Sequence, residues 1–334
     1  MDGNFLAYFG HLNIDVVFNV PELPCRGSVN IKSRREIYGG TAGNFAMVAS
    51  SLGVPFHIYS AVAKVSHESY LDFLRQRGVD LTHVYLGGDY GPICYSASDG
   101  HDQVYYVYQG PMGGPFTSNV AGDDRNYQYV HYGTGPPEDY LAFSDSFSRK
   151  KVFDPGQELS YRYSRTQLEN FLNMAEICMM NDLEFEKAKS ILNVSDDDLI
   201  GMVPVFIVTH GKTGSTVHDR GKEIQVGAFI QGKAYDTIGA GDAFRAGFYL
   251  GLHESLGIVE SVIMGSLVAG IAVQRQIPEF NSSRDEIFKL YRDNASSLLL
   301  PRDTLSGPRL GQEARVYEVQ RPDSFLSCRE RSLA

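Results

Sequence analysis

Cysteine is scarce in this sequence and tryptophan is absent, with four cysteines among 334 residues. The cysteines are Cys25, Cys94, Cys178 and Cys328, and no pair shows Cys-x-x-Cys spacing. Neither a zinc cluster nor a disulfide framework is therefore indicated. We expect reduced thiols and a cytoplasmic protein.

Long apolar runs, basic clusters and metal-binding histidine patterns are also missing. No run of about 18 apolar residues occurs, so the sequence predicts no membrane span. Asp2 and the lack of a basic segment argue against a secretion signal. The formal net charge is -10, and no long Lys/Arg stretch could follow a nucleic-acid backbone. The nine histidines have no His-x-His or His-Glu-x-x-His spacing, so no structural metal site is expected.

Short apolar runs rich in β-branched and aromatic residues alternate with helical patterns. Central strands are predicted at residues 5–9, 56–62, 129–132, 151–154, 177–181 and 205–209. Helices are predicted at residues 43–52, 69–77, 165–175, 242–252 and 259–275. The pattern predicts an α/β fold, a three-layer α/β/α domain with a mainly parallel central sheet. Such a sheet binds its ligands at the carboxyl ends of its strands.

Two stretches interrupt this alternation because they read as extended chain without an adjacent helix. Residues 16–38 and 93–110 are predicted to form a small β-sheet lid on a main domain of residues 1–300. The segment 301–334 mixes charges with Gly, Pro and Ser and has little periodicity. We expect it to be a peripheral or flexible tail.

The strongest chemical signal is the segment DTIGAGD at residues 236–242, which leads directly into an amphipathic run. A glycine loop that opens a helix directs backbone N–H groups at an anion, and the helix N-terminus adds partial positive charge. A carboxylate at that point would lie beside a bound phosphate, which suits phosphoryl transfer. Taken alone, the segment is also compatible with a tight turn in which Asp242 caps the helix.

Two glycine-containing segments near the start suggest a polar substrate. GHLNID at residues 10–15 places Asn13 and Asp15 where they could hold two adjacent hydroxyls, although such residues are usually turn formers. GGTAGN at residues 39–44 lets a ligand lie against the backbone, and Asn44 can both donate and accept hydrogen bonds.

In order and spacing, these segments resemble the ribokinase/PfkB family of carbohydrate and nucleoside kinases over residues 10–292. The family signature DTxGAGD is matched without a mismatch. The resemblance implies that Asp242 is the catalytic base and that the amides of Gly239, Ala240 and Gly241 form an anion hole. Two weaker segments, NDLE at residues 181–184 and VTHG at residues 208–211, resemble the family's NxxE and TxG motifs.

The resemblance also implies ATP and Mg²⁺ as cofactors and divides the site into two sides. The substrate side comprises Asn13, Asp15, Gly39, Gly40 and Asn44. The nucleotide side comprises Asn181, Thr209, Gly211, Thr237, Gly239 and Gly241. Glu184 is expected to hold magnesium through water. The family's GxDxxG motif is degraded here to AKVSHE at residues 63–68, a departure that concerns substrate contacts.

Substrate choice depends on two further segments. Residues 99–112 resemble the D…NQ…GAM stretch of adenosine and nucleoside kinases, and residues 153–159 resemble their DPxQxL segment. This likeness indicates the nucleoside-kinase members and assigns a substrate contact to Gln103. Aromatic side chains that could cover a nucleobase are Tyr105, Tyr106, Tyr108 and Phe116. Simple packing of these rings within the lid is the alternative.

The predicted function is ATP- and magnesium-dependent transfer of the γ-phosphate to a hydroxymethyl group, in first place the ribose 5′-hydroxyl of a nucleoside. Two alternatives remain open: a kinase for a free sugar such as ribose or fructose, and a non-catalytic binding protein of the same fold. The expected partners are small molecules, with no nucleic acid and no membrane. A homodimer formed through lid edges is compatible with the pattern, which does not decide between monomer and dimer.

Overall fold

The computed structural model describes residues 5–119, 126–144 and 149–300. Its large sheet contains β1 (Leu6–Phe9), β4 (His57–Val62), β5 (Val84–Leu86), β8 (Tyr129–Tyr132), β9 (Lys150–Phe153), β10 (Ile177–Asn181), β11 (Val205–Thr209), β12 (Ser215–Asp219), β13 (Lys222–Val226) and β14 (Leu299–Leu300). Its small sheet contains β2 (Asn13–Asn19), β3 (Ser33–Gly39), β6 (Ile93–Ser98) and β7 (Gln103–Tyr108). The predicted tail of residues 301–334 lies outside the described residues.

The strand order of the large sheet is β14-β13-β12-β11-β10-β9-β8-β1-β4-β5. Pairing is parallel from β5 through β11, whereas β12, β13 and β14 extend the sheet in antiparallel fashion. The six predicted central strands are all present, with bounds that differ by at most one residue. The prediction of a mainly parallel sheet is confirmed.

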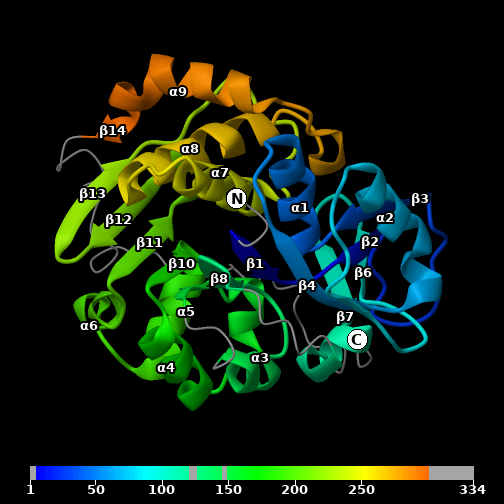
Figure 1. Cartoon of the computed structure of the whole chain (residues 1–334). Helices are drawn as coiled ribbons and strands as arrows, with labels where there is room; N and C mark the ends of the chain where they lie inside the picture. Colours follow the sequence, from blue (N-terminus) through cyan, green and yellow to red (C-terminus); the bar gives the residue numbers. More distant parts are fainter. Residues whose placement is uncertain (1–4, 120–125, 145–148, 301–334) are drawn as a thin grey trace, which may run out of the picture.

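Helices cover both faces of this sheet and form the outer layers (Figure 1). One face carries α1 (Thr41–Ser51), α2 (Lys64–Gln76), α7 (Ala240–His253), α8 (Ile258–Ala272) and α9 (Arg284–Leu298). The other carries α3 (Pro137–Ser144), α4 (Arg165–Met174), α5 (Asp182–Leu192) and α6 (Asp196–Gly201). Short 3₁₀ helices are η1 (Gly110–Gly113), η2 (Thr117–Asn119), η3 (Gly156–Ser160), η4 (Gly211–Thr213) and η5 (Ile277–Glu279). The three-layer prediction is confirmed.

The core is divided by the sheet into two hydrophobic clusters, one on each face. Helix α8 is apolar around most of its circumference because it is buried among other elements rather than lying on the surface. Glycines allow α7 and α8 to approach closely, since a methyl group on Gly247 would lie 2.5 Å from the carbonyl oxygen of Met264. This close packing of α7 against α8 positions the amino end of α7.

The small sheet has the order β3-β2-β6-β7, with β2 and β6 parallel and the outer pairs antiparallel. The expectation of extended chain throughout residues 16–38 is wrong for residues 20–32, which lie outside the strands. Pro21 and Pro24 fall in this interval, and proline cannot donate a ladder hydrogen bond. Strand β2 also begins earlier than predicted, so Asn13 and Asp15 belong to the small sheet and not to a turn.

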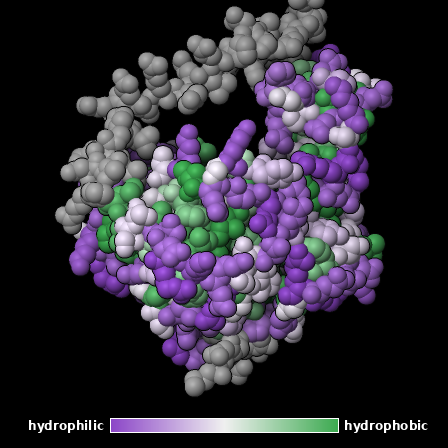
Figure 2. Space-filling model, turned by 90° about the horizontal axis from the view of Figure 1, so that it is seen from above, coloured by the Kyte–Doolittle hydropathy of each residue, from purple (hydrophilic) through white to green (hydrophobic). Residues whose placement is uncertain are grey.

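The face of the molecule seen in Figure 2 is mainly hydrophilic. In the view of Figure 2, polar residues dominate the outline and hydrophobic residues gather toward the middle of the face. Within the described ranges, no helix combines the length and the apolar character that a membrane crossing requires.

Candidate active site

The carboxyl ends of the parallel strands meet at one edge of the large sheet, where α7 begins. Gly239 is the N-cap of α7 and has a φ of 76°, a left-handed conformation that favours glycine. A methyl group there would also lie 2.6 Å from Ile277 Cγ1 and 3.1 Å from Asn44 Nδ2. Glycine is therefore required at this position by both backbone and space.

Asp242 lies in the first turn of α7 and is 6% exposed. Its Oδ2 accepts a hydrogen bond of 2.8 Å from Asn44 Nδ2, and its Oδ1 accepts one of 3.0 Å from Arg245 Nη1. Burial raises the pKa of Asp242 to about 6, although Arg245 and Asn44 oppose this rise. The carboxylate is thus ionised at neutral pH and can accept a proton.

The glycine loop before α1 meets the first residues of the small sheet. Gly40 has a φ of 83°, and a methyl group on it would lie 2.4 Å from the carbonyl oxygen of His11. A methyl group on Gly39 would lie 2.7 Å from Asp15 Oδ2 and 3.8 Å from Asn44 Oδ1. The structure therefore brings Asp15 next to Asn44, and through Asn44 next to Asp242.

Asp15 resembles Asp242 in its local chemistry. Its Oδ1 accepts a hydrogen bond of 2.8 Å from Asn13 Nδ2. Burial raises the pKa of Asp15 to about 6, and the Asn13 hydrogen bond lowers it. Two largely desolvated carboxylates, each accepting a hydrogen bond from an asparagine, thus lie close to Asn44.

Asn181 and Glu184 form a capping box at the start of α5. Asn181 Oδ1 accepts from the Glu184 N–H and Glu184 Oε2 accepts from the Asn181 N–H, both at 2.9 Å. Glu184 is 8% exposed, and burial followed by the nearby charge of Asp154 raises its pKa to about 7. Thr209 is the register partner of Asn181 at the ends of β10 and β11. Gly211 lies two residues after Thr209 and has a φ of 57°.

One N–H group of the glycine loop before α7 already has a hydrogen-bond partner within the loop. The Ala240 N–H donates to the carbonyl oxygen of Thr237 at 3.2 Å. Gly241 is exposed at the second position of α7, where the backbone N–H has no partner within the helix. Gly241 is therefore better placed to donate to an anion than Ala240.

The structure does not bring Gln103 to this cluster. Asp15 is in register with Cys94, which in turn pairs with Val107 on β7. Gln103 lies four residues before Val107 on β7, which is about 13 Å from Val107 along the strand. Its amide donates to Ser96 Oγ at 2.7 Å.

Of the aromatic side chains expected over a nucleobase, one is excluded by its burial. Phe116 is fully buried and packs edge-on against Tyr140 in the core. Tyr105, Tyr106 and Tyr108 are exposed on the outer strand of the small sheet.

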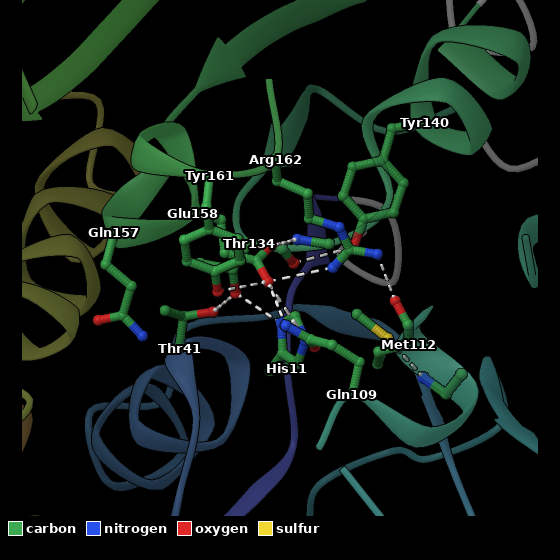
Figure 3. Close-up of polar contacts among 12 residues, drawn as sticks. His11, Thr41, Gln109, Met112, Thr134, Tyr140, Gln157, Glu158, Tyr161 and Arg162 are labelled. Atoms are coloured by element: carbon green, nitrogen blue, oxygen red, sulfur yellow. Dashed lines mark hydrogen bonds and ion pairs between the residues drawn. The ribbon is translucent and has the colours of Figure 1, made fainter. Parts of the chain in front are cut away.

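A buried polar cluster beside the glycine loop was missed by the sequence analysis (Figure 3). His11 Nε2 lies 2.6 Å from Gln109 Oε1, and Gln109 Nε2 donates to Glu158 Oε1 at 2.9 Å. The same carboxylate oxygen accepts from Arg162 Nη1 at 3.1 Å. Thr134 Oγ1 joins the cluster through His11 Nδ1 at 2.8 Å. His11 precedes β2 and Gln109 follows β7, so these contacts connect the first and last segments of the small sheet to residues that follow strands of the large sheet.

No sequence signal pairs the members of this polar cluster, because they come from separate segments. Thr41 continues it into the glycine loop, where its hydroxyl lies 2.7 Å from that of Thr134. His11, Thr41 and Glu158 each belong to a segment that resembles the family, but the sequence did not indicate that they join one polar cluster.

Comparison with known proteins agrees with the geometry. A model of pfkB family carbohydrate kinases matches residues 4–283. A nucleoside kinase of Thermoplasma acidophilum is 38% identical over 284 residues, covering 85% of this chain and 94% of that protein. The crystal structure of the Methanocaldococcus jannaschii nucleoside kinase, described as an archaeal member of the ribokinase family, has a TM-score of 0.78 at 27% identity and covers 88% of this chain and 100% of that chain.

A more distant likeness concerns the fold alone. The Burkholderia thailandensis nucleoside kinase in complex with inosine has a TM-score of 0.77 at 22% identity, covering 86% of this chain and 98% of that chain.

Proposed function

The chain belongs to the pfkB family of carbohydrate kinases and is a phosphotransferase with an alcohol acceptor, and from this premise we propose that it is a nucleoside kinase. ATP is the cosubstrate that a kinase of this family implies. The proposed reaction transfers the γ-phosphate to the ribose 5′-hydroxyl of a nucleoside. The nucleoside kinases among its relatives support this acceptor over a free sugar.

One observation carries the proposal. The hydrogen bond from Asn44 to Asp242 joins the glycine loop of α1 to the glycine loop of α7, across 198 positions of sequence. An acceptor held at the first loop and a phosphate held at the second would meet at the Asp242 carboxylate. Proximity of this kind is a main source of rate acceleration in phosphoryl transfer.

In the proposed mechanism Asp242 accepts the proton of the attacking hydroxyl. Its raised pKa makes it a stronger base than an exposed aspartate, while it still ionises below neutral pH. The N–H groups of Gly239 and Gly241, with the amino end of α7, would stabilise charge on the transferred phosphoryl group. The Ala240 N–H would join them if its bond to Thr237 opened.

Asp15 and Asn13 are proposed to hold adjacent ribose hydroxyls, with the sugar lying against Gly39 and Gly40. A cis-diol offers two donors to a carboxylate, and Asp15 has two oxygens of which one accepts from Asn13. Gln103 remains a predicted substrate contact.

Glu184 is proposed to hold Mg²⁺ through water, with Asn181, Thr209, Gly211 and Thr237 lining the nucleotide side. A buried carboxylate whose pKa is raised by burial and by the charge of Asp154 gains stability from a nearby cation. Within the described residues no three His, Cys, Asp or Glu side chains are grouped to hold a metal. Magnesium keeps several waters and binds substrate phosphates. When bound, it would neutralise phosphate charge.

Residues 1–300 are proposed to form the kinase domain, with the small sheet as its lid. All six residues of β7 are exposed at the sheet edge, which would suit pairing with a second copy in a homodimer. The free thiols of Cys25, Cys94 and Cys178 support a cytoplasmic location.

The test is a coupled ADP-release assay with ATP, magnesium and a panel of nucleosides and sugars. Inosine, which is bound in the Burkholderia structure, is the first nucleoside, and 5′-deoxyinosine is its matched control without the acceptor hydroxyl. We expect ADP release with one or more of inosine, guanosine, adenosine and cytidine, none with 5′-deoxyinosine, and little with ribose or fructose. Turnover of a free sugar alone would instead identify a sugar kinase.

A further inference from the structure

A buried ion pair lies directly behind Asp242. Asp154 follows β9, and its side chain is 2% exposed. Both of its oxygens accept from Arg245 of α7: Oδ1 from Nη2 at 2.6 Å, and Oδ2 from Nε. The remaining Nη1 of Arg245 donates to Asp242 Oδ1 at 3.0 Å. One guanidinium thus bridges two carboxylates that are 88 positions apart in sequence (242 minus 154).

This guanidinium also lies close to the glycine loop. A methyl group on Gly241 would lie only 2.9 Å from Arg245 Nη1. The positive charge therefore reaches both the proposed base and the turn proposed to bind phosphate. A two-point pairing with Asp154 fixes the plane of the guanidinium, which a single hydrogen bond would not.

Orientation follows from this pairing. Asp242 has one donor on each oxygen, Asn44 on Oδ2 and Arg245 on Oδ1. Because Asp154 holds Arg245 in place, the carboxylate plane of Asp242 is defined from two sides.

Electrostatics gives Asp154 a second effect. Arg245 lowers the pKa of Asp242, whereas Asp154 raises it. The charge of Asp154 partly offsets that of Arg245, so Asp242 is not held as a fully neutralised ion pair. The proposed base consequently keeps affinity for a proton.

The other ionisable groups near Asp242 come from several elements. Tyr8 of β1 and His131 of β8 are buried, and burial raises the pKa of Tyr8 while it lowers that of His131 to about 3. Both are neutral in the range where Asp242 titrates. Glu184 of α5 and Asp15 of β2 titrate near neutrality themselves, so they require a control.

We infer that Asp154 is a positioning residue that acts on the Asp242 carboxylate through Arg245. The inference rests on the proposed function, in which Asp242 is the base. Arg245 lies between Asp154 and Asp242, so Asp154 reaches the proposed base through the guanidinium. Removal of Asp154 should change the behaviour of Asp242 without changing substrate contacts.

The experiment compares Asp154→Asn with Arg245→Gln by two readouts. The first is the acid limb of the pH–kcat profile, and the second is the ¹³C titration of the Asp242 carboxyl, assigned by its loss in Asp242→Asn. Asp154→Asn leaves the whole charge of Arg245 on Asp242, so both readouts should move to lower pH. Arg245→Gln removes the cation, so both should move to higher pH, by about 1–3 units.

Controls separate this effect from general damage. Asp139→Asn alters an aspartate on α3 that accepts hydrogen bonds from the Phe116 and Thr117 N–H groups rather than from Arg245, and should leave both readouts unchanged. Arg245→Lys keeps the charge and should give a smaller shift than Arg245→Gln. Circular dichroism checks folding, and if Arg245→Gln does not fold, the downward shift of Asp154→Asn decides alone. The Glu184→Gln and Asp15→Asn variants, each with its own carboxyl removed, check that the limb belongs to Asp242.

Opposite shifts in Asp154→Asn and Arg245→Gln support the inference. Shifts in the same direction, or none in Asp154→Asn, overturn it and leave the pair as a structural contact. The titration does not need turnover, so a wild-type chain without kinase activity but with opposite carboxyl shifts would refute the proposed function and not the coupling.

Discussion

Two asparagine–aspartate hydrogen bonds of equal length allow the roles of the two carboxylates to be separated. Asn44 donates to Asp242 and Asn13 donates to Asp15, each at 2.8 Å. Burial raises the pKa of each aspartate to about 6, and the asparagine lowers it. Leucine branches at Cγ as asparagine does, although it is larger, and it cannot donate a hydrogen bond, so Asn44→Leu and Asn13→Leu form a matched pair of variants.

The expected magnitude follows from the lost hydrogen bond. A hydrogen bond to a charged group contributes about 1.5–3 kcal/mol, which corresponds to about 1–2 pKa units. The pKa of Asp242 in Asn44→Leu should therefore rise from about 6 to roughly 7–8. The ionised fraction at pH 7 then falls from about nine-tenths to between about a half and a tenth.

Steady-state kinetics across pH would measure this. Asn44→Leu should lose about two- to tenfold in kcat at pH 7 and recover most of it at pH 9, because the base is then ionised again. Asn13→Leu should instead raise KM for the acceptor and leave the acid limb of kcat in place. A loss in Asn44→Leu that high pH does not restore, or a shifted kcat limb in Asn13→Leu, would refute the division into base and hydroxyl ligand.

Three further outcomes are expected. Since burial raises the pKa of Asp242 to about 6, the wild-type kcat should fall with falling pH, to roughly a tenth of its plateau at pH 5; a flat profile down to pH 5 would contradict that shift. Gly239→Ala should lower kcat by about 10²-fold or more, because the added methyl group would meet Ile277 and Asn44. The control is Gly232→Ala, which has a similar φ of 78° but whose nearest neighbour is 3.9 Å away, and it should cost little activity. Equal losses of activity in the two variants would point to backbone strain alone. Arg162→Met removes a partner of the buried Glu158 and should lower the free energy of unfolding, measured in urea, by about 3–5 kcal/mol. Arg165→Met, which breaks an exposed pair, should lower it by less than about 1 kcal/mol. An equally small loss in both variants would show that the polar cluster contributes no stability.

The large parallel sheet was predictable because its strands carry a local signature. β1 is buried at every position, and such fully apolar runs are typical of strands covered on both faces. The antiparallel extension was missed. Arg220 and Gly221 form the turn between β12 and β13 with φ values of 47° and 81°, and an arginine is not a usual residue at such a position.

The site was predictable in its motifs and not in its contacts. DTIGAGD and GGTAGN each encode a local backbone shape, so a single sequence is enough to recognise them. The contacts of Glu158 with Gln109 and of Asp154 with Arg245 join segments 49 and 91 positions apart. Such pairings depend on how the whole chain packs, and no local pattern indicates them. Gln103 shows the opposite case. Its segment was recognised and does form part of the small sheet, but the residue lies far from Asp15 and Asn44.

The most direct test of the central claim is the single-turnover rate of Asp242→Asn with saturating ATP, magnesium and the preferred acceptor. Asparagine keeps the shape of the side chain and its place at the start of α7, but it cannot accept the proton. The account predicts a rate about 10²–10⁴-fold below wild type, with affinity for ATP retained in calorimetry. A rate within tenfold of wild type would show that Asp242 is not the base.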